Sequence, residues 1–271
     1  NTGSGKTVVA LMILQSCLNE DAGPAIYVVP DKYLVKQVMQ QADELGIKVV
    51  DSETDLDYQR KKAILITNIQ KLVNGKSVFG LREENNYTIG SIIIDDIHAC
   101  VGTIQEQFTV AISKENAMYN SITGLFYDVM NMQAEGRFAD IIDGRNVFDN
   151  MLVPFWSWQD KSREVYEILS ETECLQFKWN LIKDSLKLSH CYISAKGISI
   201  VPNCTPMHKI KSFDDAKRRI YMSEILTQSG AVLQSDFLDS FFQKGELIPA
   251  IVQESGSKEV LMLAYMNRES L

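Results

Sequence analysis

The chain has 271 residues, 45% of them hydrophobic and 23% charged, so it can bury a substantial core in one large domain or two ordinary ones. The formal net charge of −8 excludes a uniformly basic nucleic-acid-binding surface but leaves room for local basic clusters. No apolar run approaches the roughly 20 residues that a membrane-spanning helix needs. The five cysteines are scattered without C-x-x-C spacing. We therefore expect a cytoplasmic protein with reduced thiols, no zinc motif and no membrane partner.

The first seven residues, N-T-G-S-G-K-T, match the second half of a phosphate-binding loop of the form G-x-x-x-x-G-K-[ST]. Glycine lets backbone N–H groups approach phosphate oxygens, lysine brings a positive charge to the β- and γ-phosphates, and a threonine hydroxyl can bind Mg²⁺. The candidate ATP-binding residues are Gly3, Ser4, Gly5, Lys6 and Thr7. The apolar stretch that follows predicts a buried helix with its N-terminus facing the anion. The alternative is a loop that only caps this helix.

In folds with such a loop, a buried strand leads directly into it, usually from the middle of the sheet. That strand does not precede Asn1. We therefore expect either that the natural protein continues upstream or that the sheet lacks its first strand.

Short apolar runs alternate with helical patterns further along the chain. The runs at 25–29, 63–67 and 92–94 predict buried strands, and the spacing of apolar residues predicts a helix from Asp31 to Gly46. This alternation is typical of an α/β fold with a doubly wound, mostly parallel sheet. Ligands of such sheets bind at the carboxyl ends of the strands.

Two acidic residues, Asp95 and Asp96, follow the run of isoleucines at 92–94 and so stand at such a carboxyl end. A carboxylate here could hold Mg²⁺ through water, the role expected for Asp95, while Asp96 would orient the attacking water. His98 becomes a candidate for coupling the nucleotide to neighbouring motifs. The alternative is a strand that ends in two acidic residues at the surface.

Four stretches together resemble motifs I, Ia, Ib and II of superfamily 2 DEAD/DEAH-box helicases, in order and in spacing: T-G-S-G-K-T, Y-V-V-P-D-K-Y-L-V-K-Q, I-L-I-T-N-I-Q-K-L and I-I-I-D-D-I-H-A. The resemblance implies a RecA-like P-loop NTPase domain, ATP and Mg²⁺ as cofactors, with Thr7 and Asp95 on the metal, and DNA or RNA as the partner. It also implies that Pro30, Lys32, Gln37 and Thr67 line the nucleic-acid track. The chain departs from the family at Asp31, where threonine is usual, and at Asp96, where glutamate is usual.

Several lysines lie near these motifs. Lys32 and Lys36 could contact phosphates, and Lys61, Lys62 and Lys71 are nearby in the sequence. For any one of these lysines, a place on a solvated helix face is the simpler interpretation.

The stretch S-F-D-D-A-K-R-R-I-Y-M-S-E-I-L resembles the segment that leads to motif III, usually S-A-T, but only Ser223 matches. The resemblance implies a coupling role for Ser223, while Glu224 and Ile225 depart from the family pattern. In the long interval before it, we expect helical stretches over roughly 103–134 and 158–189 and a β-hairpin over 191–201 that turns at 195–197. Trp156 and Trp158 could stack on bases, although a place in the core is the favoured interpretation.

The last part of the chain changes character. Two β-like runs, Ile248–Gln253 and Glu259–Met266, flank a polar turn and predict a hairpin. The runs L-I-P-A-I-V-Q and V-L-M-L-A-Y-M-N resemble the amino-terminal segment of phosphoribosyl-AMP cyclohydrolase, a metal-dependent enzyme of histidine biosynthesis. The metal ligands of that family lie further downstream, and residues 240–271 contain no His, Cys or carboxylate cluster that could activate water. An ordinary hairpin is the alternative.

These patterns predict two incomplete pieces in one chain: a helicase ATP-binding domain over 1–225, truncated at its N-terminus, a junction over 226–239 and a partial cyclohydrolase-like segment over 240–271. The parent protein would be an ATP hydrolase. The second RecA-like domain, which would supply an arginine finger worth about 10³–10⁵ in rate, is missing, so we expect weak ATP binding and negligible turnover. The alternatives are a cyclohydrolase-like metalloenzyme and a non-enzymatic P-loop scaffold.

Overall fold

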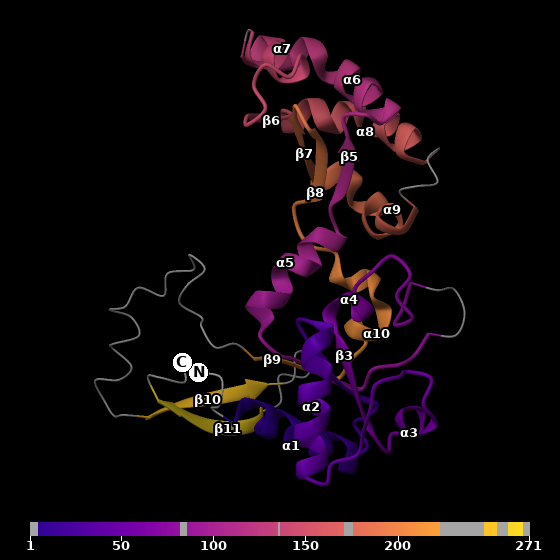
Figure 1. Ribbon diagram of the computed structural model, residues 1–271, viewed down its shortest axis with the longest axis vertical. Coiled ribbons are helices and arrows are strands. Elements are labelled where there is room, and N and C mark those ends of the chain that lie inside the picture. Colours follow the sequence, from indigo (N-terminus) through magenta and orange to yellow (C-terminus); the bar gives the residue numbers. More distant parts are fainter. Residues whose placement is uncertain are drawn as a thin grey trace. The chain divides into compact units, whose positions relative to one another are not determined.

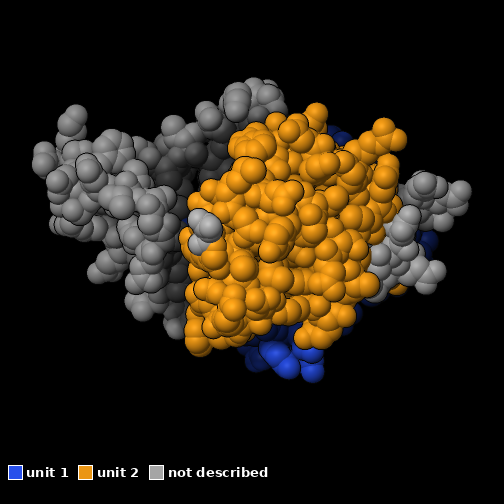
Figure 2. Space-filling model, turned by 90° about the horizontal axis from the view of Figure 1, so that it is seen from above, with its two compact units in different colours: residues 1–72, 78–103, 210–271 blue, residues 73–77, 104–209 orange. Residues whose placement is uncertain are grey.

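The computed structural model describes residues 5–81, 86–134, 136–170 and 176–222, and the strands at 247–253 and 260–267. The chain divides into two compact units (Figure 2). Unit 1 comprises residues 1–72, 78–103 and 210–271, and unit 2 comprises residues 73–77 and 104–209. Unit 2 is thus formed mainly by the long interval between the second and third motifs. The predicted domain bounds of 1–225, 226–239 and 240–271 stay a prediction.

Unit 1 is built on a five-stranded parallel sheet with the strand order β2-β3-β1-β4-β9 (Figure 1). Its strands are β1 (Ala25–Val29), β2 (Val49–Val50), β3 (Ile64–Asn68), β4 (Ser91–Ile94) and β9 (Arg218–Tyr221). The three predicted strands are confirmed as β1, β3 and β4, and so is the parallel α/β fold. Their unbroken apolar sequences follow from burial on both faces, which removes the need for alternation.

Helices connect these strands and cover the sheet. They are α1 (Lys6–Asn19), α2 (Lys32–Glu44), α3 (Leu56–Gln59), α4 (Ile69–Leu72), α5 (Ile97–Gln107) and α10 (Lys211–Asp214). Helices α1 and α2 lie on one face of the sheet, where Leu11, Leu14 and Val38 pack in one cluster with Tyr27 and Ile93 (Figure 1). The spacing of the buried residues in α1 is that of a helix with one face in the core. The predicted buried helix after the loop is therefore confirmed.

Asp31, which departs from the helicase motif, has a local structural role. Its backbone is extended, and its side chain accepts a hydrogen bond from the Tyr33 amide as the N-cap of α2. An aspartate is among the preferred residues for this position because it satisfies an N–H group that has no partner within the helix. The helix ends before Gly46, whose φ of 67° lies in the left-handed region.

Unit 2 contains a four-stranded antiparallel sheet with the order β5-β8-β7-β6. Its elements are β5 (Val110–Ser113), α6 (Ala117–Gln133), α7 (Arg137–Ile142), β6 (Asn150–Leu152), α8 (Phe155–Ser170), α9 (Gln176–Ile182), η2 (Lys183–Leu188), β7 (Ser189–Ser194), β8 (Gly197–Pro202) and η3 (Met207–Lys209). Strands β7 and β8 form the predicted hairpin, with Ala195 and Lys196 in the turn.

The expected helical stretch over 103–134 is wrong in its middle, because β5 separates α5 from α6. Val110 and Ile112 are buried while Ala111 and Ser113 are exposed, which is the period of a strand with one face in the core. The pattern is only four residues long, so it is the pairing with β8 that makes this segment a strand. The stretch expected over 158–189 is better matched, by α8, α9 and η2, although α8 already begins at Phe155.

The two tryptophans of α8 have different environments. Trp158 is 1% exposed, its Nε1 donates to the Leu186 carbonyl at 2.8 Å, and its ring stacks on Phe126 at a centroid distance of 5.8 Å. The core interpretation is therefore confirmed for Trp158. Trp156 is 63% exposed, so it lies at the surface of unit 2.

The predicted C-terminal pair of strands is confirmed as β10 (Leu247–Gln253) and β11 (Val260–Asn267), which pair antiparallel. Their register places Ala250 opposite Ala264. In the part of the chain that the structure describes, no helix is long and apolar enough to cross a membrane. Cys17, Cys100, Cys191 and Cys204 are free thiols, and Cys174 lies outside the described residues.

Candidate nucleotide-binding site

The acidic pair lies at the carboxyl edge of the sheet in unit 1, directly after β4. The Asp95 amide donates to the Val28 carbonyl of β1 at 2.8 Å. On the other side, the Met222 amide donates to the Ile94 carbonyl and the Ile97 amide donates to the Met222 carbonyl, both at 2.9 Å. The backbone on either side of Asp95 is thus fixed by β1 and by the end of β9, and Asp95 stands where parallel sheets bind ligands.

The glycine-rich loop ends at Gly5, whose φ of 73° and ψ of 8° place it in the left-handed region that favours glycine. Helix α1 begins at the next residue, Lys6, and no side chain caps Gly5. The first turn of a helix presents N–H groups without intrahelical acceptors, together with the positive end of the helix dipole. Such an end favours an anion. Gly3 and Ser4 lie outside the described residues.

Tyr27 of β1 connects the loop to the acidic pair. Its hydroxyl donates to Asp95 Oδ2 at 2.8 Å, and the side chain of Thr7 acts to lower the pKa of the same phenol. The whole residue is 0% exposed. Burial raises the pKa of Tyr27 well above its usual value, and the neighbouring charge of Asp95 raises it further. Thr7 and Asp95, far apart in the sequence, therefore both influence the pKa of Tyr27.

Asp96 has an unusual backbone conformation, with a φ of 42°. Residues other than glycine adopt this region rarely, although aspartate tolerates it better than most, and such outliers concentrate at functional sites. The Asp96 amide donates to Asp95 Oδ1 at 2.9 Å, and Asp96 Oδ1 accepts from the Ala99 amide at 3.5 Å, at the start of α5. The strained turn thus holds the two carboxylates in fixed positions relative to each other.

Cys100, a buried thiol, and His98, the predicted coupling residue, lie in the first turns of α5, directly after the acidic pair. Cys100 Sγ lies 3.5 Å from the Asp95 carbonyl oxygen. Burial, together with the charges of Asp96 and Asp95, raises the pKa of the Cys100 thiol to about 12, so this cysteine is protonated at neutral pH. His98 is half-buried in the turn that follows Asp96.

The donor set fits Mg²⁺. The Thr7 hydroxyl and the Asp95 carboxylate are hard oxygen donors, which Mg²⁺ prefers over nitrogen and sulfur. Among the described residues no group of three or more His, Cys, Asp or Glu side chains could hold a metal. A magnesium ion at a nucleotide site is usually held by one or two protein oxygens, by water and by the phosphates themselves, so a larger cluster is not required.

The residues predicted to line a nucleic-acid track do not all share one surface. Lys32 and Gln37 are exposed on α2, and Pro30 immediately precedes that helix. Thr67 of β3 is only 2% exposed, and its hydroxyl has no hydrogen-bond partner among the described residues. In this conformation nucleic acid cannot contact the Thr67 hydroxyl. Ser223 lies outside the described residues, and the assignments of all these residues stay predictions.

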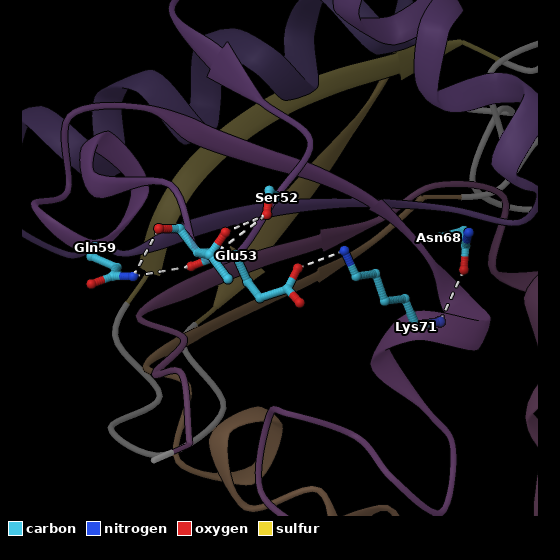
Figure 3. A network of polar contacts seen from close by, with 6 residues as sticks. Ser52, Glu53, Gln59, Asn68 and Lys71 are labelled. Carbon is cyan, nitrogen blue, oxygen red and sulfur yellow. Dashed lines mark hydrogen bonds and ion pairs between the residues drawn. The ribbon is translucent and has the colours of Figure 1, made fainter.

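Two of the lysines near the motifs, Lys61 and Lys71, form ion pairs within unit 1. Lys61 precedes β3, at the edge of the sheet opposite Asp95, and its Nζ lies 2.9 Å from Asp21. Lys71 follows β3, and its Nζ lies 2.5 Å from Glu53, as Figure 3 shows. The Lys71 amide also donates a hydrogen bond to Asn68 Oδ1 at 2.9 Å. These ion pairs favour a structural role for both lysines over contact with nucleic-acid phosphates.

Sequence reasoning did not single out Tyr27. A signal was available, because a tyrosine within the otherwise aliphatic strand A-I-Y-V-V must find a partner for its hydroxyl once it is buried. The identity of the partner depends on strand order, which places β4 directly beside β1.

Comparison with known proteins supports the helicase resemblance for the first part of the chain. Residues 1–130 match the family model described as "Type III restriction enzyme, res subunit". This match confirms the expectation of a helicase-type domain. Among solved structures, the chain is similar to S. tokodaii Xpd4, with a TM-score of 0.46 and 16% sequence identity over 82% of this chain and 51% of that chain.

Curated proteins match the chain only over short stretches. It is 60% identical over 40 residues to the phosphoribosyl-AMP cyclohydrolase of Clostridium botulinum (strain 657 / Type Ba4), covering 14% of this chain and 36% of that protein. It is 70% identical over 30 residues to the histidine biosynthesis bifunctional protein HisIE of Wolinella succinogenes, covering 11% and 13%. The match to the Bacillus cereus (strain AH187) cyclohydrolase is 72% over 29 residues, covering 11% and 28%. The chain thus spans little more than a third of these relatives at most.

Proposed function

We propose that unit 1 is the ATP-binding motor domain of a nucleic-acid helicase, with the triphosphate held between the start of α1 and the end of β4. The observation that carries this proposal is the position of Asp95 at the carboxyl edge of the parallel sheet, where its carboxylate accepts from Tyr27 and from the Asp96 amide. In nucleotide sites with a phosphate-binding loop of this type, the threonine of the loop and an aspartate at such a strand end hold the same metal ion. The match of residues 1–130 to a helicase-type family model supports the same conclusion.

Each residue of the site has a distinct role in this proposal. The N–H groups of the first turn of α1 and the ammonium of Lys6 bind the β- and γ-phosphates. Thr7 offers its hydroxyl to Mg²⁺, which when bound neutralises charge on the phosphates, and Asp95 accepts hydrogen bonds from water around that ion. The carboxylate of Asp96, whose contact to the Ala99 amide is long at 3.5 Å, orients the attacking water.

The nucleic-acid partner is DNA or RNA. Exposed polar residues of α2, Lys32 and Gln37, together with Pro30, give the proposed contact surface, which lies in the same unit as the nucleotide site. Lys61 and Lys71 are not part of it, because each is paired with a carboxylate. We further propose that efficient turnover needs a second RecA-like domain to supply an arginine, and that the protein acts in the cytoplasm.

Calorimetric titration of the full chain with Mg·ATP tests this function. We expect measurable binding that Lys6→Ala weakens by at least about tenfold, since a hydrogen bond to a charged group is lost. Lys36→Ala, which removes an exposed lysine of α2 in the same unit, is the matched control and should leave the affinity unchanged. Absence of ATP binding by the unaltered chain, or equal affinity of Lys6→Ala, would overturn the proposal.

A second candidate function is favoured by one observation, the 60% identity over 40 residues to a phosphoribosyl-AMP cyclohydrolase. This match supports a cyclohydrolase-like origin for the C-terminal segment. Metal analysis of the purified chain separates the two functions. The helicase proposal predicts no stoichiometric zinc, whereas one bound zinc together with hydrolysis of phosphoribosyl-AMP would favour the cyclohydrolase.

A further inference from the structure

We propose that Tyr27 is a positioning residue for the metal of the bound nucleotide: its hydroxyl orients the Asp95 carboxylate so that this carboxylate is ready to receive hydrated Mg²⁺. This inference rests on the proposed nucleotide site. It adds a residue outside the glycine loop and outside the acidic pair, and it assigns that residue an effect on metal affinity rather than on phosphate affinity.

The direction of the hydrogen bonds follows from what each group can donate. An ionised carboxylate only accepts, so the single proton of the Tyr27 hydroxyl goes to Asp95 Oδ2, at 2.8 Å. The Tyr27 proton is thus committed to the carboxylate, and the Thr7 side chain, which lowers the pKa of Tyr27, can act on the phenolic oxygen only as a donor.

The Asp95 carboxylate is held at both oxygens. Oδ2 accepts from Tyr27, and Oδ1 accepts from the Asp96 amide at 2.9 Å. Two hydrogen bonds to different oxygens fix the plane of the carboxylate, while each oxygen keeps lone pairs for water bound to a metal. The group is therefore oriented before the metal arrives, which reduces the reorganisation that binding requires.

Tyr27 itself is fixed by the core of unit 1. It is 0% exposed, its backbone lies between Ile66 of β3 and Ile93 of β4, and its ring belongs to the cluster beneath α1. The phenolic oxygen thus has a defined position that does not depend on the nucleotide. In Tyr27→Phe the ring can stay in place, but Asp95 Oδ2 loses the donor that orients it.

The test is a titration of the full chain, loaded with a fluorescent ATP analogue, with Mg²⁺. We expect Tyr27→Phe to raise the Mg²⁺ concentration at half-maximal effect about tenfold, while the affinity for the nucleotide in EDTA stays unchanged. The matched control is Tyr58→Phe. Tyr58 is 1% exposed in the same unit and donates to the Thr88 carbonyl at 2.8 Å, at the opposite edge of the sheet, so its removal should change neither value.

The outcomes separate this inference from the proposed function. If the unaltered chain binds no nucleotide, the proposed function itself fails. If the unaltered chain binds nucleotide but Tyr27→Phe keeps the same Mg²⁺ midpoint, or loses affinity equally with and without Mg²⁺, the positioning role is overturned and the function stands.

Should Tyr27→Phe fail to fold, 3-fluorotyrosine at position 27 keeps the ring and the hydroxyl. Fluorination makes the phenol more acidic and therefore a stronger donor to Asp95, so the carboxylate is held more firmly. We expect the Mg²⁺ midpoint to fall for fluorotyrosine at position 27 and to stay unchanged for fluorotyrosine at position 58. An unchanged midpoint overturns the inference.

Discussion

The hydroxyl of Tyr27 and the carboxylate of Asp95 lie 2.8 Å apart although 68 positions separate them in the chain. The contact arises because β1 and β4 are adjacent parallel strands that place Tyr27 directly beside Ile93. Helix α1 packs on the same face of the sheet as Tyr27, and Thr7 in its first turn acts to lower the pKa of that tyrosine. Strand order, and not any local motif, therefore joins the glycine loop to the acidic pair.

Two buried tyrosines of unit 1, Tyr27 and Tyr58, predict a loss of stability in alkaline solution. Burial raises the pKa values of Tyr27 and Tyr58, with further contributions from the charges of Asp95 and Glu53 respectively. Because the folded-state pKa lies above the usual value of about 10, the unfolded chain releases these protons first. The stabilisation is complete below pH about 10 and is lost as the pH rises toward the folded-state pKa.

Urea denaturation of the full chain between about pH 8 and pH 11 measures this effect. We expect the free energy of unfolding to fall above about pH 10, and to fall less steeply in Tyr58→Phe, which removes one of the linked protons. Stability that stays constant over this range, or an equally steep fall in Tyr58→Phe, would contradict the assignment.

The cysteines should differ sharply in reactivity. Cys204 is exposed, whereas Cys100 and Cys191 are each 0% exposed and burial raises both of their thiol pKa values. Since the thiolate is the reactive form, alkylation at about pH 8 should label Cys204 first and the other two only after unfolding. Mass spectrometry of the labelled peptides reports each site. Rapid labelling of Cys191 in the folded chain would show that the core of unit 2 is open.

Thr67→Val should stabilise unit 1. The Thr67 side chain is 2% exposed with a hydroxyl that has no partner among the described residues, and burying such a group costs about 1–3 kcal/mol. Valine has nearly the same shape, so we expect the free energy of unfolding to rise by about 1 kcal/mol. The control is Thr123→Val, which removes a buried hydroxyl that donates to the Tyr119 carbonyl at 2.8 Å and should destabilise by a similar amount. Lower stability of Thr67→Val would indicate a partner for this hydroxyl.

Two glycines of unit 2 predict opposite effects of alanine. A Cβ at Gly75 would lie 1.9 Å from the backbone oxygen of Phe177, so Gly75→Ala must displace the main chain of one of the two segments. A Cβ at Gly124 in α6 meets nothing within 4 Å, and alanine is the better helix former by roughly 1 kcal/mol. Thermal denaturation should show a lower transition temperature for Gly75→Ala and a slightly higher one for Gly124→Ala. Equal stability of Gly75→Ala and the unaltered chain would contradict the close packing of these segments.

The sequence predicts the sheet of unit 1 well because its signals are long and unambiguous. The runs that become β1, β3 and β4 are apolar at nearly every position, which is what burial on both faces requires. Helix α2 has both an apolar stripe and a cap at Asp31. The glycine loop and the acidic pair could be proposed because each combines several rare residue types in a fixed order.

Other features depend on contacts between distant segments. The alternation of Val110 and Ile112 is too short to distinguish a strand from a helix until β8 pairs with it. The inclusion of residues 73–77 in unit 2 depends on the close approach of Gly75 to Phe177. The pairing of Lys71 with Glu53 and the contact of Tyr27 with Asp95 are likewise set by the tertiary fold.

In the proposed site, the glycine loop and the acidic pair serve one nucleotide. Nuclear magnetic resonance of the isotope-labelled chain with Mn·ATP tests this directly, because bound Mn²⁺ broadens the signals of nearby amides. We predict that the amides of Thr7 and Asp96 broaden together and recover with excess Mg²⁺, while the amide of Lys61, at the opposite edge of the sheet, is far less affected. Broadening at Thr7 without broadening at Asp96 would contradict a shared site.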